Sequence, residues 1–221
     1  QNNAPSVQQT VEEALSRLLG QSVTINGCSR TDTGVHAKEF YFNVKIDNNI
    51  PCDGFIKGMN SLLPHDIAVH SCCDADDDFH ARYCSKGKEY IYKIWNSRVR
   101  NPFLNGLSLH YRYEMDVEKL CREAQAFVGT HDFTSFCTLD KREKGDFTRT
   151  VQYFDVKREG ELVTMTVAAD GFLYNMVRIM VGTLLAINNG RIPYGTLSDI
   201  IKAENRSAAG PTAPPCGLYL N

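Results

Sequence analysis

The side chains best suited to chemistry lie in one short segment, residues 27–37, which reads GCSRTDTGVHA. Asp32 is its single carboxylate, and Arg30 lies two positions before it. A carboxylate acts as a nucleophile when it is fixed, ionised and partly shielded from water, and a nearby guanidinium favours the ionised form. The string Thr-Asp-Thr-Gly is also typical of a turn in which the Asp side chain bonds its own backbone. The segment therefore predicts a catalytic aspartate or a structural turn.

A phosphatase-like aspartyl site is the nearest alternative chemistry. Such a site needs a second carboxylate two residues after the nucleophile, and Gly34 occupies that position. A separate acidic run is explained by a solvated loop: Asp74, Asp76, Asp77 and Asp78. The chain shows no Ser/His/Asp order, Gly-rich phosphate loop or metal-ligand spacing. We therefore expect no metal and no cofactor.

A second candidate is Arg178, which lies inside the apolar stretch NMVRIMV at residues 175–181. An unpaired charge is costly to bury, so this arginine needs a partner or a route to solvent. A structural carboxylate would satisfy it, and so would a functional group such as Asp32 or a phosphate. We expect Arg178 to lie within salt-bridge reach of Asp32.

A third feature is the stretch of residues 82–100, where basic and aromatic side chains alternate. Its members are Arg82, Tyr83, Lys86, Lys88, Tyr90, Tyr92, Lys93, Trp95, Arg98 and Arg100, against the single acid Glu89. Basic groups bind phosphates and aromatic faces stack on unstacked bases. An amphipathic strand with lysines along its edge has the same composition. The stretch predicts either an RNA-binding surface or an ordinary strand.

The remaining charged and titratable groups near these motifs suggest no chemistry. A second basic group is most simply a solvated loop: Lys141, Arg142, Lys144 and Arg149. His36 and His80 have no partner visible in the sequence, so we expect both to make structural hydrogen bonds.

The composition limits the class of protein. With 221 residues, 43% of them hydrophobic, the chain can bury one large core or two small ones. Its net charge of -2 means that nucleic-acid binding would need a local basic patch. Eight cysteines without a CxxC pair predict reduced thiols and a cytoplasmic protein. The apolar run 172–187 is short and interrupted, which predicts a buried helix and no membrane span.

Hydrophobic periodicity predicts a similar succession of elements in both halves of the chain. In the first half it predicts helices at 7–19, capped by Ser6, and 55–63, with strands at 23–25, 40–46 and 67–72. In the second half it predicts strands at 89–95, 151–156, 162–168 and 217–220, and helices at 117–128, 172–187 and 196–203. The fold class is therefore α+β, with two split-βαβ, ferredoxin-like halves at 1–80 and 81–221. The first half lacks one strand, so we expect an N-terminally truncated chain.

Six segments, taken together and in order, resemble the TruA family of tRNA pseudouridine synthases. The signature at residues 30–37, RTDTGVHA, departs from the family pattern at Thr33, where Ala is more common. The other segments are DFHAR at 78–82, KEYIY at 88–92, GTHDFTSF at 129–136, NMVR at 175–178 and GLYL at 217–220. The resemblance covers almost the whole chain, and family members have a further strand and a Tyr-Asp-Gly segment ahead of its start.

The resemblance implies a fold, an activity and a set of roles. The two halves would form a continuous mixed or antiparallel sheet with a central catalytic cleft, in a homodimer. The reaction would isomerise uridine at positions 38 to 40 of the tRNA anticodon arm, without metal or cofactor. The implied roles are Asp32 as nucleophile, Arg178 as its partner, Tyr90 stacking on the base, Leu218 as an apolar wall, and Arg30 holding the nucleotide. A non-catalytic RNA-binding protein and a metal-dependent hydrolase remain as alternatives.

Overall fold

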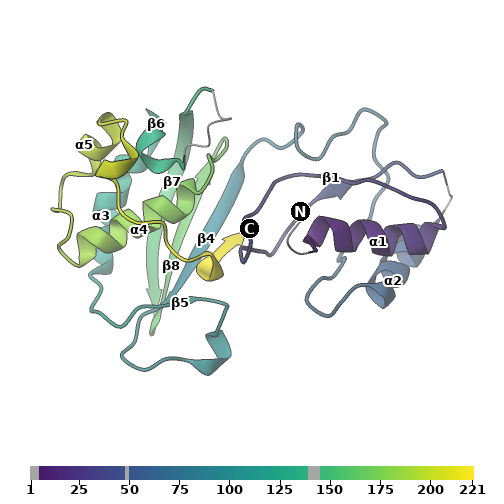
Figure 1. Ribbon diagram of the computed structural model, residues 1–221, viewed down its shortest axis with the longest axis horizontal. Coiled ribbons are helices and arrows are strands. Elements are labelled where there is room, and N and C mark those ends of the chain that lie inside the picture. Colours follow the sequence, from purple (N-terminus) through teal and green to yellow (C-terminus); the bar gives the residue numbers. More distant parts are fainter. Residues whose placement is uncertain (1–4, 48–49, 139–144) are drawn as a thin grey trace. The chain divides into compact units, whose positions relative to one another are not determined.

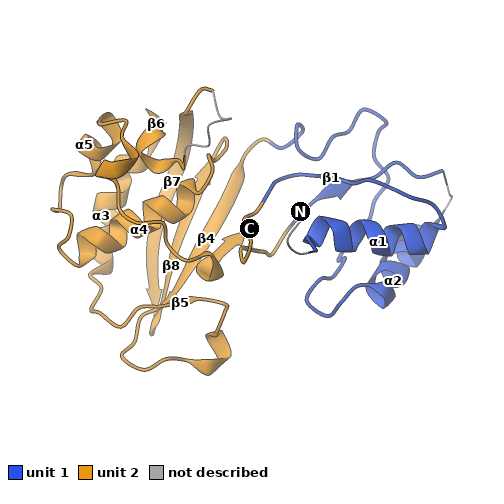
Figure 2. Ribbon diagram, in the orientation of Figure 1, with its two compact units in different colours: residues 1–30, 40–85 blue, residues 31–39, 86–221 orange. Residues whose placement is uncertain are grey.

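The computed structural model describes residues 5–47, 50–138 and 145–221 (Figure 1). The chain forms two compact units (Figure 2): residues 1–30 with 40–85, and residues 31–39 with 86–221. The segment 31–39, which carries Asp32, thus belongs to the larger unit although its neighbours on both sides belong to the smaller one. Asp32 therefore lies in the same unit as elements that come much later in the sequence.

The smaller unit is built from two helices and a short two-stranded sheet. The helices are α1 (Val7–Leu19) and α2 (Cys52–Leu62), and the antiparallel strands are β1 (Asn26–Gly27) and β3 (Phe42–Asn43). As predicted, the Ser6 side chain caps α1 by accepting a hydrogen bond from the backbone N–H of Gln9 at 3.1 Å. Gly20, at φ 69°, ends the helix in the left-handed conformation. Leu15 and Met59 are fully buried in this unit's core.

Its strands are fewer and shorter than predicted. The strand expected at 67–72 is absent from the described residues, because the Asn60 side chain bonds both the N–H and the C=O of Val69, at 2.7 and 2.8 Å. The backbone is therefore satisfied by an amide and has no need of a neighbouring strand. Likewise, the N–H of Ile25 donates to Glu12 at 3.0 Å, so the strand predicted at 23–25 forms only at 26–27.

The larger unit contains the remaining helices and strands. Its strands are β2 (His36–Ala37), β4 (Lys88–Trp95), β5 (Leu109–His110), β6 (Gly129–Asp132), β7 (Thr148–Glu159), β8 (Leu162–Ala169) and β9 (Leu218–Leu220). Its α-helices are α3 (Val117–Ala124), α4 (Met176–Asn188) and α5 (Leu197–Lys202). Short 3-10 turns are η1 (Pro102–Leu104), η2 (Gln125–Phe127), η3 (Thr134–Phe136), η4 (Arg206–Ala208) and η5 (Pro215–Gly217).

These strands form one seven-stranded mixed sheet in the order β2-β9-β4-β8-β7-β6, with β5 paired to β4. The four strands β9-β4-β8-β7 pair antiparallel with one another. This spatial order is the one that a β-α-β-β-α-β succession gives in a ferredoxin-like unit. The parallel pairs β2–β9 and β4–β5 make the sheet mixed. The predicted α+β class is confirmed.

The apolar helix α4 is buried along nearly its whole length and lies in the core of the larger unit. It begins at Met176, four residues later than predicted, because Asn175 adopts a left-handed conformation at φ 62°. No helix in the described ranges is long and apolar enough to span a membrane.

The two faces of the sheet differ along β4. Tyr90, Tyr92 and Ile94 are buried on one face. Lys93 and Trp95 alternate with them and lie half-buried on the other. The buried face carries Tyr90, which the resemblance predicts to stack on the base.

Candidate active site

A tight turn presents Asp32. The C=O of Asp32 accepts a hydrogen bond from the N–H of Val35 at 3.1 Å, and Gly34 supplies the positive φ, 81°, that the turn requires. Strand β2 follows at once and pairs in parallel with β9, while the N–H of Lys38 donates to the C=O of Leu220 at 2.8 Å. The turn predicted from the sequence is therefore present in the backbone, and the sheet edge fixes its position.

The Asp32 side chain is engaged by an ion pair. Nη1 of Arg178 lies 2.9 Å from Oδ2 of Asp32, and the two side chains are 16% and 28% exposed. The prediction that Arg178 lies within salt-bridge reach of Asp32 is confirmed. Because both groups are largely shielded from solvent, counter-ions screen this pair much less than a surface pair.

Arg178 is itself held from two other sides. Its Nε donates to the C=O of Ala213 at 2.8 Å, and its Nη1 also donates to Oδ1 of Asn175 at 2.7 Å. In return, the N–H of Ala213 donates to the C=O of Arg178 at 3.0 Å. The guanidinium is therefore fixed before any substrate binds, which keeps Asp32 aimed in one direction.

A glycine in α4 makes room for this arrangement. A Cβ added at Gly182 would lie 1.7 Å from the C=O oxygen of Pro211, so only glycine lets the chain around Ala213 approach the helix so closely. The Ala213 carbonyl that holds Arg178 is placed by this contact. Nothing in the sequence indicated the role of Gly182 or of Ala213.

Tyr92 lies beside Arg178 on the buried face of β4. Its hydroxyl donates to the C=O of Pro214 at 2.7 Å. Burial raises the pKa of the Tyr92 phenol, Cys216 adds to the rise, and Arg178 acts in the opposite direction. The phenol is therefore neutral at physiological pH.

Tyr90 and Leu218 lie on the same face of the sheet as Tyr92. Leu218 is the register partner of Tyr92, and Tyr90 is the partner of Leu220, so their side chains point to one side. Tyr90 and Leu218 are both buried, with 7% and 5% of their surface exposed. The Tyr90 ring meets Phe172 edge-on, with centroids 5.2 Å apart.

Arg30 is exposed and belongs to the smaller unit, whereas Thr31 begins the segment that packs with the larger one. Its role in holding the nucleotide stays a prediction.

The two histidines near the motifs make structural contacts, as expected. Nε2 of His36 lies 2.9 Å from the C=O of Gly106, and its ring stacks on Tyr219 at 4.7 Å. Nδ1 of His80 accepts a hydrogen bond from the N–H of Arg82 at 3.2 Å. Neither contact suggests proton transfer.

The other charged groups considered above show no site. All four residues of the acidic run are exposed, and Asp77 pairs with Lys45 at 3.1 Å. Lys141, Arg142 and Lys144 lie outside the described residues. Arg149, in β7, donates to the backbone carbonyls of Asp146 and Thr148. The eight cysteines are all described, and none is disulfide-bonded. Within those same ranges, no three His, Cys, Asp or Glu side chains cluster as metal ligands would.

Comparison with known proteins agrees with this geometry. A family model described as tRNA pseudouridine synthase matches residues 124–221. The tRNA pseudouridine synthase A of Acetivibrio thermocellus is 42% identical over 220 residues, which is 100% of this chain and 90% of the relative. Those of Moorella thermoacetica and Staphylococcus aureus (strain MRSA252) are 42% and 40% identical, over 99% and 100% of this chain and 88% and 83% of their own lengths. Since such identity extends along the whole of this sequence, the chain belongs to the TruA family of tRNA pseudouridine synthases.

Proposed function

We propose that this protein isomerises uridine to pseudouridine in tRNA, at positions 38 to 40 of the anticodon arm, with Asp32 as the nucleophile. The observation that carries the proposal is the partly buried Asp32 carboxylate, held at 2.9 Å by an arginine that is itself fixed from two sides. The names of the relatives support tRNA as the substrate. The proposal includes a homodimer in the cytoplasm and a reaction without metal or cofactor.

The proposed chemistry suits a single carboxylate. Pseudouridine forms when the N1–C1′ bond breaks, the base turns, and C5 bonds to C1′ in its place. Asp32 would attack either the base or C1′ of the sugar through a carboxylate oxygen and be released when the new bond is complete. Arg178 keeps that oxygen oriented, because its own contacts to Ala213 and Asn175 fix the guanidinium. The hydrogen on C5 leaves to solvent, so the atoms balance without a redox partner.

The target base must leave its stack before Asp32 can reach it. We propose that Tyr90 stacks on the flipped base, that Leu218 forms an apolar wall of the pocket, and that Arg30 holds the nucleotide. Tyr90 and Leu218 lie on the sheet face that also carries Tyr92, next to Arg178. Because Phe172 meets the Tyr90 ring edge-on, a base stacked on Tyr90 also contacts Phe172 or displaces it.

Changing Tyr90 tests its stacking role. We expect Tyr90→Phe to retain base stacking, whereas Tyr90→Ala loses about 1–3 kcal/mol of contact with the base. The measurement is kcat/KM for tRNA, together with the unfolding temperature, because truncating a nearly buried ring also leaves a cavity. Tyr90→Leu, which fills most of that space without an aromatic face, separates the two effects. Equal kcat/KM for the Leu and Phe variants would show that Tyr90 does not stack on the base.

Tritium release from C5 tests the activity directly. Transfer RNA labelled with tritium at uridine C5 is incubated with the protein in the presence of a chelator, and tritiated water is counted. We expect release, and we expect it to weaken as salt rises, because phosphate contacts dominate tRNA affinity. Substitution of the uridines at positions 38 to 40 is expected to stop it.

Three outcomes contradict parts of the proposal. Equal loss of label from tRNA that lacks those uridines refutes the anticodon-arm assignment. Absence of release from every tRNA, with tRNA still bound, favours a non-catalytic RNA-binding protein. Release that the chelator abolishes points to a metal-dependent reaction.

A further inference from the structure

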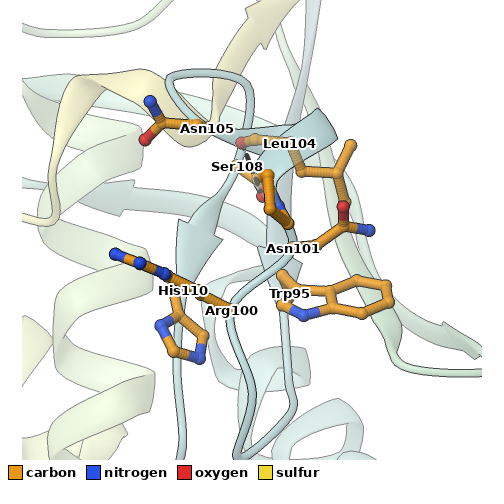
Figure 3. A pocket seen from close by; sticks show the side chains of 8 residues that line it. Trp95, Arg100, Asn101, Leu104, Asn105, Ser108 and His110 are labelled. Carbon is orange, nitrogen blue, oxygen red and sulfur yellow. Dashed lines mark hydrogen bonds between the residues drawn. The ribbon is translucent and has the colours of Figure 1, made fainter.

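A second concave site lies in the larger unit, where β4 ends and runs through η1 to β5 (Figure 3). It encloses about 270 Å³, and its lining includes Trp95, Arg100, Asn101 and His110. None of these residues contributes to the Asp32–Arg178 pair. Trp95 and His110 are register partners in the parallel pair β4–β5, so they point to the sheet face opposite Tyr92. The cavity is therefore distinct from the proposed catalytic site.

The cavity lies in a stretch of the chain whose charged side chains are all basic. Residues 96–113 contain three arginines and no Asp or Glu, although the protein as a whole carries a net charge of -2. Arg100 is exposed, and among the described residues its guanidinium has no hydrogen-bond or ion-pair partner. In Figure 3, Arg100 and His110 extend toward one end of the cavity and the Trp95 ring lies toward the other. The lining thus offers an uncommitted cation at one end and an aromatic face at the other.

The polar atoms of the lining have defined roles. Nε1 of Trp95 donates to the C=O of Val99 at 2.9 Å, which fixes the indole. Nε2 of His110 lies 2.9 Å from the C=O of Ser97. A carbonyl only accepts hydrogen bonds, so Nε2 carries the hydrogen, and in the neutral ring Nδ1 is an acceptor. Asn101 uses Oδ1 to accept from the N–H of Phe103 at 3.0 Å, which leaves its amide hydrogens for a ligand.

The loop around the cavity is anchored rather than free. The hydroxyl of Tyr219 donates to the C=O of Leu107 at 2.6 Å, and the His36 ring bonds the C=O of Gly106. The His36 side chain comes from β2, the edge strand of the main sheet, and Tyr219 comes from its neighbour β9. Since the backbone is held in this way, a ligand does not need to order the loop on binding, which lowers the entropic cost of association.

We propose that this cavity binds one nucleotide of tRNA that is not the reacting uridine. Arg100 contacts its phosphate, the Trp95 indole stacks on its base, and Nδ1 of His110 accepts a hydrogen bond from its ribose 2′-hydroxyl. The volume is at the small end for ligand sites, which suits a single unstacked nucleotide and excludes a duplex. The inference rests on the proposed function for its partner, because tRNA is the RNA that this protein would meet.

Trp95 provides the readout, because it is the only tryptophan in the chain. Tryptophan emission is recorded while unlabelled tRNA is added to the wild-type protein, and filter binding gives the dissociation constant in parallel. Stacking of a base on the indole is expected to quench the emission along the same binding curve. In Arg100→Gln, both curves are expected to shift to about tenfold higher tRNA concentration. The slope of log K against log salt is expected to fall in magnitude by about 1.

Arg98→Gln is the matched control. Arg98 is exposed in the same loop but does not line the cavity, so this variant is expected to bind like the wild type. Turnover at saturating tRNA is expected to be unchanged in Arg98→Gln, because Arg98 lines neither the cavity nor the Asp32 site. Bound tRNA with unchanged Trp95 emission, or equal losses in the two variants, would overturn the proposal. If quenching occurs but no tRNA releases tritium, the catalytic proposal fails while the nucleotide site stands.

Discussion

Replacement of Asp32 by Asn is expected to abolish turnover while the protein still folds and binds tRNA. An amide is nearly isosteric with a carboxylate but is a poor nucleophile, so the rate should fall on the order of 10⁴-fold or more. The amide oxygen can still accept a hydrogen bond from Nη1 of Arg178, which now lies 2.9 Å from Oδ2. We therefore expect a loss of no more than about 1–2 kcal/mol in the free energy of unfolding. Single-turnover tritium release and urea unfolding measure the two effects.

Asp155→Asn is a suitable control for this substitution. Asp155 forms a half-exposed ion pair with Lys157 at 3.7 Å on β7, away from the turn that presents Asp32. Loss of that pair is expected to change neither turnover nor stability measurably. Single-turnover release near the wild-type rate in Asp32→Asn would show that another group is the nucleophile.

Replacement of Arg178 by Lys is expected to lower kcat about 10²-fold although the charge is retained. The guanidinium reaches Ala213, Asn175 and Asp32 at the same time through Nε and Nη1. An ammonium is a single point of charge and cannot keep all three contacts in one plane. Asp32 then loses its fixed direction, and a displacement of about 1 Å at a reacting group can cost a factor of this size. The measurement is kcat at saturating tRNA.

Two comparisons keep this prediction specific. Arg158→Lys disrupts a similar guanidinium contact, from Nη2 to Oδ1 of Asn96 at 2.7 Å, outside the proposed catalytic site, and is expected to leave kcat unchanged. In a double-mutant cycle of Asp32→Asn with Arg178→Met, we expect a coupling of about 1–3 kcal/mol in the free energy of unfolding. Additive losses would mean that the ion pair contributes nothing, and an unchanged kcat in Arg178→Lys would refute its positioning role.

The elements that the sequence determined are those governed by local rules. The Ser6 cap of α1 depends on a few neighbouring residues. The succession β-α-β-β-α-β also follows from local periodicity, and it leads to the ferredoxin-like order of the larger unit. For the site, the residue types were sufficient to single out Asp32 and Arg178.

The tertiary structure decided those features that depend on contacts with residues distant in the sequence. Whether residues 67–72 form a strand depended on the Asn60 amide, which satisfies Val69 in place of a neighbouring strand. The start of α4 depended on the left-handed Asn175, whose side chain also bonds Arg178. A hydrogen-bond ladder needs a second strand, and sequence periodicity describes only one.

The sequence by itself determined that a carboxylate stands in a turn and that an arginine stands in an apolar helix. Only the tertiary structure decided that these two side chains, separated by 146 residues, form one ion pair. Their meeting requires the parallel pairing of β2 with β9 and the close approach of the Ala213 segment to Gly182. Such contacts depend on how distant segments pack, and local propensity carries no information about which distant segment will arrive.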